Sequence, residues 1–253
     1  MGVLSVKSGR SIAITWERPP LNVFDLALLR EMDQALTACA QDAEVDVAVF
    51  QGAGTRAFSA GVDIRDHTRE KVPEMLEAVH GVIRKMLALP QVTIAAVRGL
   101  CLGGGCEIAS SCDLIIAGED STFATPEILV GCYPPVALAR FAQLIGYHRA
   151  AEMILTGRRF SAREAEAFGL INRVADVEQF DSGVSELVNE LTSKSGSVLR
   201  LTLKGLRERS CDGFEQALKR SEEIYCRELL RTEDVEEGVS AFLEKRAPNW
   251  RHR

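Results

Sequence analysis

Metal ligands, disulfide pairs and membrane segments are all poorly represented in this sequence. Its four histidines are scattered, and no two of its seven cysteines form a CxxC pair. This spacing argues against a zinc site or a disulfide framework, and an odd, unpatterned set of cysteines is typical of a reducing cytoplasm. The first residues show no signal-peptide pattern and no apolar run is long enough to cross a bilayer. We therefore expect a cytoplasmic protein without a membrane partner.

Charge of one sign is also nowhere concentrated. The net charge is −6, with 36 acidic and 30 basic residues, and no long run carries a single sign. A nucleic-acid partner would favour a basic stripe, so we expect none. An anionic small ligand is not excluded, because it needs only a local positive rim.

The order of the expected elements predicts an α/β fold. Apolar runs of strand length alternate with amphipathic helices in the first half of the chain, whereas the pattern from Val136 onward is almost purely helical. The expected strands are 4–7, 12–16, 45–50, 93–97 and 114–117, and the expected helices are 25–39, 73–89, 106–112, 137–145, 149–155, 162–168, 177–191, 198–208, 214–229 and 232–242. The 253 residues are thus expected to form a core over residues 1–195 and a C-terminal helical region over residues 196–253.

Two glutamates in the middle of the chain each follow a turn-forming element. Glu107 comes after the glycines 103–105, and Glu127 comes directly after Pro126. Two carboxyl groups that face one cavity can hold a water between them, one removing its proton while the other delivers a proton elsewhere. The alternative is that each glutamate only stabilises the first turn of a helix, where negative charge is favourable.

Two loops of small residues, 58–63 and 103–105, are candidates for binding negative charge. Glycine lets the backbone approach a ligand closely, and the N–H groups of Val62 and Gly104 can meet across a cavity. Two such donors form an oxyanion hole. Taken separately, each loop is better explained as an ordinary connection between a strand and a helix.

Motifs along nearly the whole chain resemble one known family in the same order. They lie at residues 57–64, 95–113, 123–128, 155–157, 165–170 and 237–246. The sequence is similar in these segments to the crotonase (enoyl-CoA hydratase/isomerase) superfamily. The resemblance implies a ClpP/crotonase-like spiral of ββα units with a C-terminal helical region that assembles homotrimers or homohexamers.

The resemblance also implies an acyl-coenzyme A thioester as substrate, with neither a metal nor a separate cofactor. By position, Glu107 and Glu127 match the two catalytic glutamates of the family, and the N–H groups of Val62 and Gly104 match the donors that hold the thioester oxygen. The residues implied to bind coenzyme A are Pro20, Leu21, Val23, Ala60, Asp63, Ile64 and Lys245. Lys245 is expected to reach a phosphate, of the same or a neighbouring subunit.

The segment 131–137 departs from the family pattern. Ordinary hydratases have several glycines here, whereas this chain has Tyr133-Pro134-Pro135, which stiffens the loop and adds bulk. We expect Tyr133 and Pro134 to border the acyl pocket, with plain packing as the alternative for Tyr133. His67 is a further candidate for the acyl pocket, or else a surface histidine. The replacement resembles the cyclohexa-1,5-diene-1-carbonyl-CoA hydratases, which add water to a ring diene conjugated with the thioester.

Three activities are compatible with these residues. An enoyl-CoA hydratase uses both glutamates, and both are present. A Δ-isomerase moves a proton with one glutamate and needs no activated water, so retention of two acids favours it less. A non-catalytic relative that binds coenzyme A or RNA is disfavoured by the two acids and the negative net charge.

Overall fold

The computed structural model describes residues 1–211 and 213–252. Its strands are β1 (Gly2–Ser8), β2 (Ser11–Glu17), β3 (Val47–Gly52), β4 (Ala57–Ser59), β5 (Val92–Val97), β6 (Leu100–Leu102), β7 (Leu114–Gly118), β8 (Thr122–Ala124), β9 (Phe160–Ser161) and β10 (Arg173–Ala175). Its α-helices are α1 (Leu26–Gln41), α2 (Val72–Ala88), α3 (Gly104–Ser110), α4 (Pro135–Ile145), α5 (Tyr147–Thr156), α6 (Ala162–Ala167), α7 (Phe180–Thr192), α8 (Gly196–Ser210), α9 (Phe214–Arg227) and α10 (Glu233–Leu243). The 3₁₀ helices are η1 (Ile64–Asp66), η2 (Pro126–Val130), η3 (Val177–Gln179) and η4 (Leu229–Arg231).

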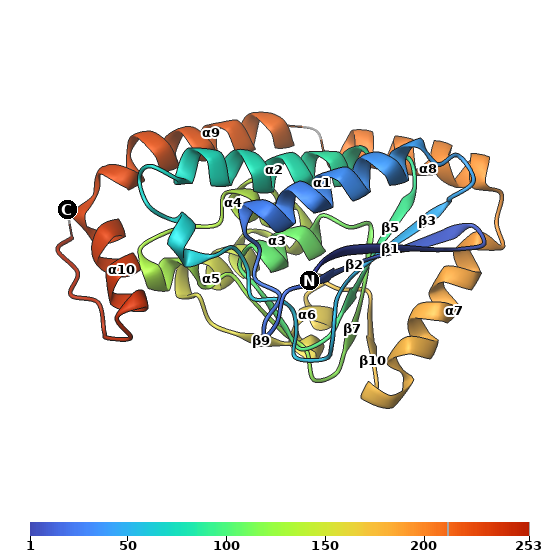
Figure 1. The fold of residues 1–253 in the computed structure, drawn as a ribbon, viewed down its shortest axis with the longest axis horizontal. Coiled ribbons are helices and arrows are strands. Elements are labelled where there is room, and N and C mark those ends of the chain that lie inside the picture. The colour runs from blue at the N-terminus through green and yellow to red at the C-terminus, as the bar shows by residue number, and fades with distance from the viewer. Residues whose placement is uncertain (212, 253) are drawn as a thin grey trace.

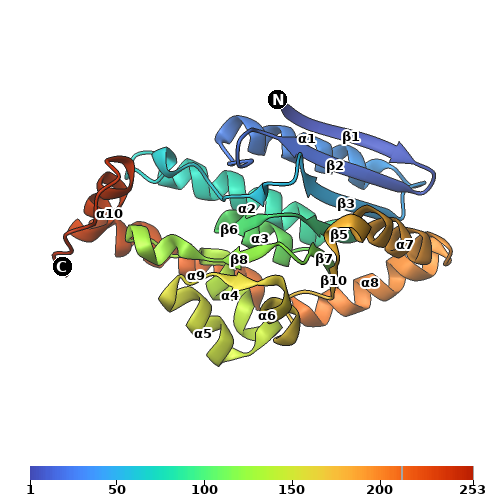
Figure 2. The same ribbon diagram turned by 90° about the horizontal axis from the view of Figure 1, so that it is seen from below.

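The chain winds through two sheets in a repeated path. The larger sheet has the order β1-β2-β3-β5-β7-β10 and the smaller sheet the order β4-β6-β8-β9. Among the strand pairs within residues 1–211 and 213–252, only β1–β2 and β8–β9 are antiparallel. The chain places β3 in the large sheet, β4 in the small sheet and then α2, and it repeats this path with β5, β6 and α3 (Figure 1 and Figure 2). This is the predicted spiral of ββα units, and the α/β class is confirmed.

Both faces of the large sheet are buried, so its central strands are apolar throughout. Successive side chains of a strand point to opposite faces. In β3, Ala48 and Phe50 join the main core, while Val47 and Val49 join a second core on the other face. The second core is closed by Phe180 and Leu187 of α7 and Leu203 of α8, and the main core by α1, α2 and α3. Figure 2 shows α7 and α8 close to these strands, on the side away from α2.

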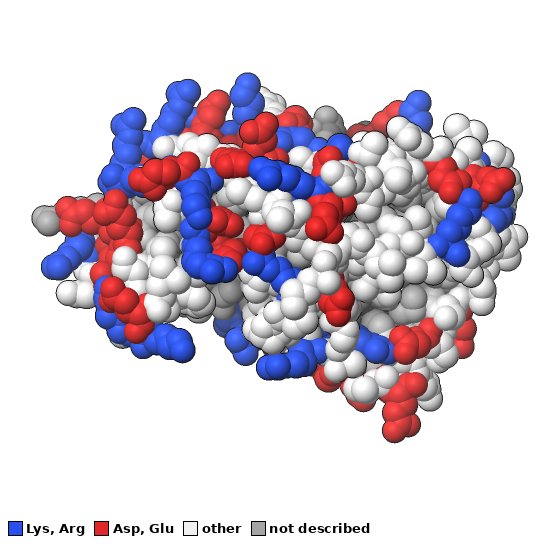
Figure 3. Space-filling model, viewed as in Figure 1, with Lys and Arg blue, Asp and Glu red and all other residues white. Residues whose placement is uncertain are grey.

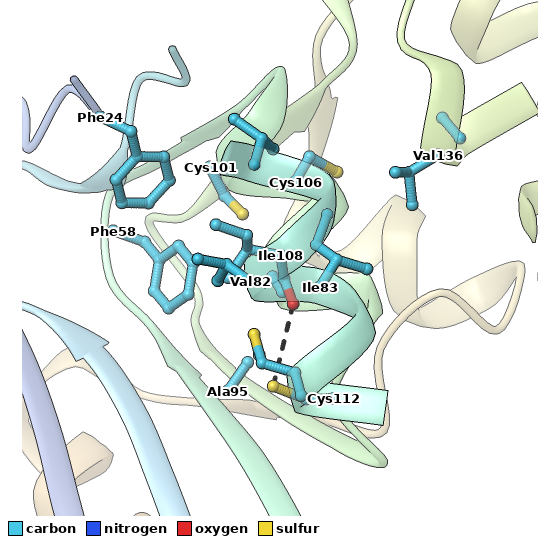
Figure 4. Close-up of a cluster of buried hydrophobic side chains, with 14 of the residues drawn as sticks. Phe24, Phe58, Val82, Ile83, Ala95, Cys101, Cys106, Ile108, Cys112 and Val136 are labelled. Carbon is cyan, nitrogen blue, oxygen red and sulfur yellow. Dashed lines mark hydrogen bonds between the residues drawn. The ribbon is translucent and has the colours of Figure 1, made fainter. Parts of the chain in front are cut away.

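Helix α3 is buried along its whole length within the main core. Figure 4 shows Cys106 and Ile108 of α3 packed with Val82 and Ile83 of α2, with Val136 of α4 on the far side. All seven residues of α3 are buried. The helix that carries Glu107 is therefore packed into the apolar core, which fixes the position of that carboxyl group beside the cavity.

The C-terminal helices pack onto the core. The expected boundary falls at the start of α8, since Ser195 is its N-cap. Helix α9 lies against α4 and beside α2, and Leu218 and Tyr225 on α9 belong to the main core (Figure 1). Helix α10 contacts η2, which carries Glu127.

The small sheet and β10 are absent from the elements expected from the sequence. Strands β4, β6, β8 and β9 have only two or three residues each, too few for an alternating pattern to appear. The chain after Val136 is almost purely helical, as expected, and among the described residues only the short strands β9 and β10 interrupt the helices. The expected helix 177–191 begins in the structure as η3 and continues as α7.

The surface of the protein carries charged side chains of both signs, as the composition suggests. Acidic and basic side chains are interspersed over α1, α2 and α9 on the face shown in Figure 3. Within residues 1–211 and 213–252, no helix combines the length and the apolar character needed to span a bilayer. The same residues contain no cluster of three or more side chains suited to a metal ion.

One ion pair ties α8 to the large sheet. Arg207 donates to both carboxylate oxygens of Asp113, with N–O distances of 2.9 and 2.6 Å, and the same carboxylate accepts from the Thr93 backbone N–H at 2.8 Å. The Arg207 and Asp113 side chains are only 12% and 18% exposed. Removal of one partner would leave the other charge largely buried without its counter-ion.

We therefore expect Arg207→Met to lower the free energy of unfolding by about 3 kcal/mol, as measured by urea denaturation. Lys204→Met is the matched control on the same helix, because Lys204 is exposed and its pair with Glu208 spans 4.0 Å. The control should change stability by less than about 0.5 kcal/mol. Equal stabilities for the two variants would show that the ion pair does not hold α8 in place.

Candidate active site

A largely apolar cavity of about 470 Å³ lies between the small sheet, α2 and the C-terminal helices. Its size is within the range of small-molecule sites. Its walls come from segments far apart in the sequence: the loop after β4, helix α2, the glycine turn before α3, η2, the segment 133–135, Tyr225 of α9 and Phe242 of α10. Glu107 and Glu127 both line it.

The small sheet explains why these segments meet. Strands β4, β6 and β8 are parallel neighbours, so their carboxyl ends lie at the same edge. The residues that follow these strands are 60–62, 103–104 and 125–127. One edge of the small sheet, where β4, β6 and β8 end, thus brings together both candidate loops and Glu127.

The glycine turn requires glycine at its first position. Gly103 has a φ of 55°, a conformation that side-chain-bearing residues rarely adopt. A Cβ atom on Gly103 would also lie 2.7 Å from Oε1 of Glu127. The Glu127 carboxyl group therefore rests directly against the turn from which α3 begins.

The two candidate N–H donors lie close together. A Cβ atom on Gly104 would be 3.6 Å from the Val62 nitrogen, and one on Gly61 would be 3.3 Å from the Gly104 nitrogen. Gly104 is the first residue of α3, so its N–H has no acceptor within the helix. The parallel bridge between Val62 and Phe24 uses the Asp63 N–H and the Gly61 carbonyl, not the Val62 N–H. Both donors thus remain available to a ligand.

The loop that carries Val62 is braced by buried side chains. Ser59 Oγ donates to the Asn22 carbonyl at 2.7 Å and accepts from the Gly61 N–H at 3.0 Å. Asn22 Nδ2 donates to the Ala57 carbonyl at 2.7 Å, and Trp16 Nε1 donates to the Phe58 carbonyl at 2.7 Å. These bonds fix the backbone on both sides of the loop.

Glu107 is 4% exposed and binds the N-terminus of another helix. Its Oε1 accepts hydrogen bonds from the backbone N–H groups of Val136 at 2.9 Å and Ala137 at 3.0 Å, in the first turn of α4. Burial raises the pKa of Glu107 above its usual value, while His80 and the two amide donors act in the opposite direction. Glu107 therefore does stabilise a helix N-terminus, as the alternative interpretation of the sequence expected. The stabilised helix is α4, however, and not α3, to which Glu107 belongs.

Glu127 has a poorer environment for negative charge. Its Oε2 is buried and has no hydrogen-bond partner among the described residues. Burial and the neighbouring negative charge of Glu107 raise the pKa of Glu127 to about 8. Of the two carboxyl groups, Glu107 is the better placed to carry negative charge, because two amide donors at a helix N-terminus lie beside it.

The structure brings most of the sequence-derived candidates to one cavity. Those that line it are Leu21, Ala60, Val62, Ile64, His67, Gly104, Glu107, Glu127, Tyr133 and Pro134. Those outside its lining are Pro20, Val23, Asp63 and Lys245. Pro20 and Lys245 are exposed, whereas the Asp63 carboxylate accepts from the backbone and side chain of Arg65 at 3.0 and 2.9 Å. The assignment of these four to coenzyme A stays a prediction.

The acyl-pocket candidates differ in how they are held. Burial lowers the pKa of His67, which favours its neutral form in the cavity wall. Tyr133 donates its hydroxyl hydrogen to the Ser221 carbonyl at 2.7 Å, and its ring lies edge-on to Tyr225 with centroids 5.0 Å apart. The loop that departs from the family pattern is thus attached to α9.

Three polar residues of the cavity were not expected from the sequence, namely His80 on α2, Arg159 before β9 and Tyr225 on α9. In the sequence, His80 is one of four scattered histidines. The only indication of its place in the cavity is its position on the apolar face of α2, which also carries the cavity residues Met75, Leu76 and Val79. Nothing in the sequence marks Tyr225 as different from other core aromatics.

Comparisons with known proteins agree with this geometry. The family model described as enoyl-CoA hydratase/isomerase matches residues 8–253. A cyclohexa-1,5-dienecarbonyl-CoA hydratase from Thauera aromatica is 32% identical, with 98% of this chain and 95% of that protein covered. A short-chain-enoyl-CoA hydratase from Clostridium acetobutylicum is 33% identical, with 96% of this chain and 95% of that protein covered.

Solved structures give the same result for the fold. The crystal structure of an enoyl-CoA hydratase from Mycobacterium avium subsp. paratuberculosis K-10 has a TM-score of 0.90 at 29% identity, and the match covers 99% of this chain and 98% of that one. The resemblance to the crotonase superfamily is thereby confirmed. The chain belongs to the enoyl-CoA hydratase/isomerase family, which is a family of enzymes.

Proposed function

We propose that this enzyme is an enoyl-CoA hydratase that adds water across a double bond conjugated to an acyl-CoA thioester. The observation that carries the proposal is the pair of buried carboxyl groups in one cavity, one with two amide donors and the other with none on Oε2. Hydration needs a base and an acid at the same time, and two carboxyls in unequal environments supply both at neutral pH.

Each glutamate has one role in the proposed reaction. Glu107, as the ionised group, removes a proton from water while the water oxygen bonds to the β-carbon. Glu127, as the protonated group, gives its proton to the α-carbon. The N–H groups of Val62 and Gly104 hold the thioester oxygen, on which negative charge gathers as the β-carbon is attacked.

Coenzyme A is proposed to enter along the loop after β4. Leu21, Ala60 and Ile64 line the cavity on this side. Beyond the cavity, the coenzyme A portion of the substrate is proposed to contact Pro20, Val23, Asp63 and Lys245. No metal and no separate cofactor takes part in the proposed chemistry.

The acyl group is proposed to be a cyclic diene. Tyr133, Pro134 and Pro135 replace a flexible segment with a rigid one at the cavity wall, and the edge-on contact of Tyr133 with Tyr225 adds two aromatic rings at that end. A flat, rigid ring suits such walls better than a flexible straight chain does. The similarity to the Thauera aromatica protein supports the same substrate class.

Self-association is part of the proposal. Several large apolar side chains in the C-terminal half are more than one-third exposed, namely Leu129, Leu138, Leu144, Leu155, Phe242 and Leu243. Where exposed apolar side chains form a contiguous patch, they are typical of an interface. We propose a homotrimer or homohexamer.

Glu107→Gln and Glu127→Gln should each lower kcat by roughly 100- to 10,000-fold, because each removes one proton-transfer group. Thioester binding, measured by calorimetry with a non-reactive acyl-CoA, should be retained. The wild-type reaction in ¹⁸O-labelled water should place label in the product. Wild-type turnover in both variants would refute the two-carboxylate mechanism, and an unlabelled product would indicate a Δ-isomerase instead.

Gly104→Ala should lower kcat by roughly 100- to 1,000-fold, the effect of losing one oxyanion donor. The new Cβ would lie 2.9 Å from Cγ2 of Val62, so Val62 or Gly104 must shift and the paired geometry of the two N–H groups is disturbed. Gly81→Ala is the control on α2, where a Cβ meets nothing within 4 Å. The control should keep wild-type kinetics, and equal kinetics for both variants would show that the Gly104 N–H does not contact the thioester.

The substrate class is tested by comparing crotonyl-CoA, longer straight-chain enoyl-CoAs and cyclohexa-1,5-diene-1-carbonyl-CoA, each followed by loss of enoyl absorbance. We expect kcat/KM for the cyclic substrate to exceed that for crotonyl-CoA by roughly tenfold or more, as differences in apolar pocket filling typically give. A preference for crotonyl-CoA would rule out the ring assignment while leaving hydration itself intact.

A further inference from the structure

Two residues that line the cavity carry a buried polar atom with no hydrogen-bond partner among the described residues. One is Glu127, through Oε2, which already has a role in the proposed reaction. The other is Tyr225 on α9, whose hydroxyl group has none. Tyr225 is only 1% exposed. A buried hydroxyl group without a partner is unfavourable, so a native protein that keeps one beside a cavity usually has a use for it.

The ring of Tyr225 is held in place, although its hydroxyl group is not satisfied. The ring of Tyr133 meets it edge-on with centroids 5.0 Å apart, and Tyr133 is itself bound to the Ser221 carbonyl, one turn earlier on α9. The Cys132 thiol lies beside the Tyr225 hydroxyl group. A thiol is a weak hydrogen-bonding group, however, and this sulfur lies 3.7 Å from the Val130 carbonyl oxygen. Packing therefore fixes the hydroxyl group without giving it a good partner.

One short segment, which runs from η2 to the start of α4, links Tyr225 with both glutamates. Near its start, the Cys132 N–H donates to the Glu127 carbonyl at 2.9 Å. In its middle, the Cys132 thiol and the Tyr133 ring contact Tyr225. At its end, the first N–H groups of α4 donate to the Glu107 carboxylate. Tyr225 is therefore packed against the segment that carries one glutamate and binds the other.

The proposed reaction brings one oxygen atom to the glutamates. The thioester oxygen is proposed to lie elsewhere, at the N–H groups of Val62 and Gly104. The oxygen of the attacking water must lie where Glu107 can remove a proton from it, and it becomes the hydroxyl group of the product. Glu107 takes one hydrogen of this water, and the other hydrogen needs an acceptor. Burial raises the pKa of Tyr225 well above its usual value, so its hydroxyl group stays neutral and can both accept and donate.

We propose that the Tyr225 hydroxyl group contacts the oxygen that is added to the substrate. It accepts the second hydrogen of the attacking water and then hydrogen-bonds to the hydroxyl group of the product. Tyr225 gains and loses no proton in this role, and the proton transfers remain with Glu107 and Glu127. The role rests on the proposed function, because the partner of Tyr225 is identified from the hydration step.

Tyr225→Phe tests this role, because it removes only the hydroxyl oxygen. We expect kcat for hydration to fall roughly tenfold, the effect of one neutral hydrogen bond. The midpoint of urea unfolding should not fall, because no hydrogen bond of the fold is lost. Tyr133→Phe is the comparison for stability: it removes the bond to the Ser221 carbonyl and should lower the midpoint. Tyr147→Phe, at a 72% exposed position on α5, is the control for activity and should change neither quantity.

A second measurement compares two ligands that differ by one hydroxyl group, 3-hydroxybutyryl-CoA and butyryl-CoA. Calorimetry gives both dissociation constants in a Glu127→Gln background, which blocks turnover. Addition of Tyr225→Phe should weaken binding of 3-hydroxybutyryl-CoA roughly tenfold and leave that of butyryl-CoA within about twofold. A role of Tyr225 in packing alone predicts the same change for both ligands.

Two results would overturn the inference. One is a change in binding that is equal for the two ligands, or no change for either, because the hydroxyl group then does not contact the added oxygen. The other is a loss of stability in Tyr225→Phe as large as that in Tyr133→Phe, which would show that the hydroxyl group has a partner within the fold. If the wild-type enzyme hydrates no enoyl-CoA, the proposed function fails, whereas the paired binding measurement still decides whether Tyr225 recognises a hydroxyl group on the acyl chain.

Discussion

A buried carboxylate must be given hydrogen-bond donors or it takes up a proton, and the arrangement around Glu107 follows from this constraint. The first two free N–H groups of α4 point at Glu107, so the start of α4 is fixed relative to α3. The rigid segment 133–135 immediately precedes those donors. The same contact therefore sets the charge of one carboxyl group and positions one wall of the cavity.

The protonation of Glu127 depends on the negative charge that the α4 donors favour at Glu107. The negative charge held at Glu107 adds to the effect of burial and keeps Glu127 protonated at neutral pH. Two residues of one type thus acquire opposite roles from their surroundings alone. His80 and Glu222 add a hydrogen bond between α2 and α9 beside the cavity, with Nδ1 of His80 lying 2.6 Å from Oε1 of Glu222.

Sequence patterns were informative where elements are long or turns are chemically distinctive. The apolar strand β5 and the amphipathic helix α2 were expected close to their observed bounds, and glycine and proline marked the turns before Glu107 and Glu127. The strands of the small sheet have two or three residues and carry no pattern of their own, so the parallel pairing of β4, β6 and β8 could not be foreseen. His80 and Glu222 are 142 residues apart, and nothing in either local sequence indicates the other.

The sequence by itself determined the α/β class, the likeness to one enzyme family and the two glutamates with their turns, because these depend on local residue types and their order. Only the tertiary structure decided that Val62, Gly104 and Glu127 share one sheet edge, that Glu107 faces the N-terminus of α4, and that Tyr225 closes the cavity. These relations arise from packing between distant segments. Burial and donor geometry, which exist only after folding, then set the protonation of each carboxyl group.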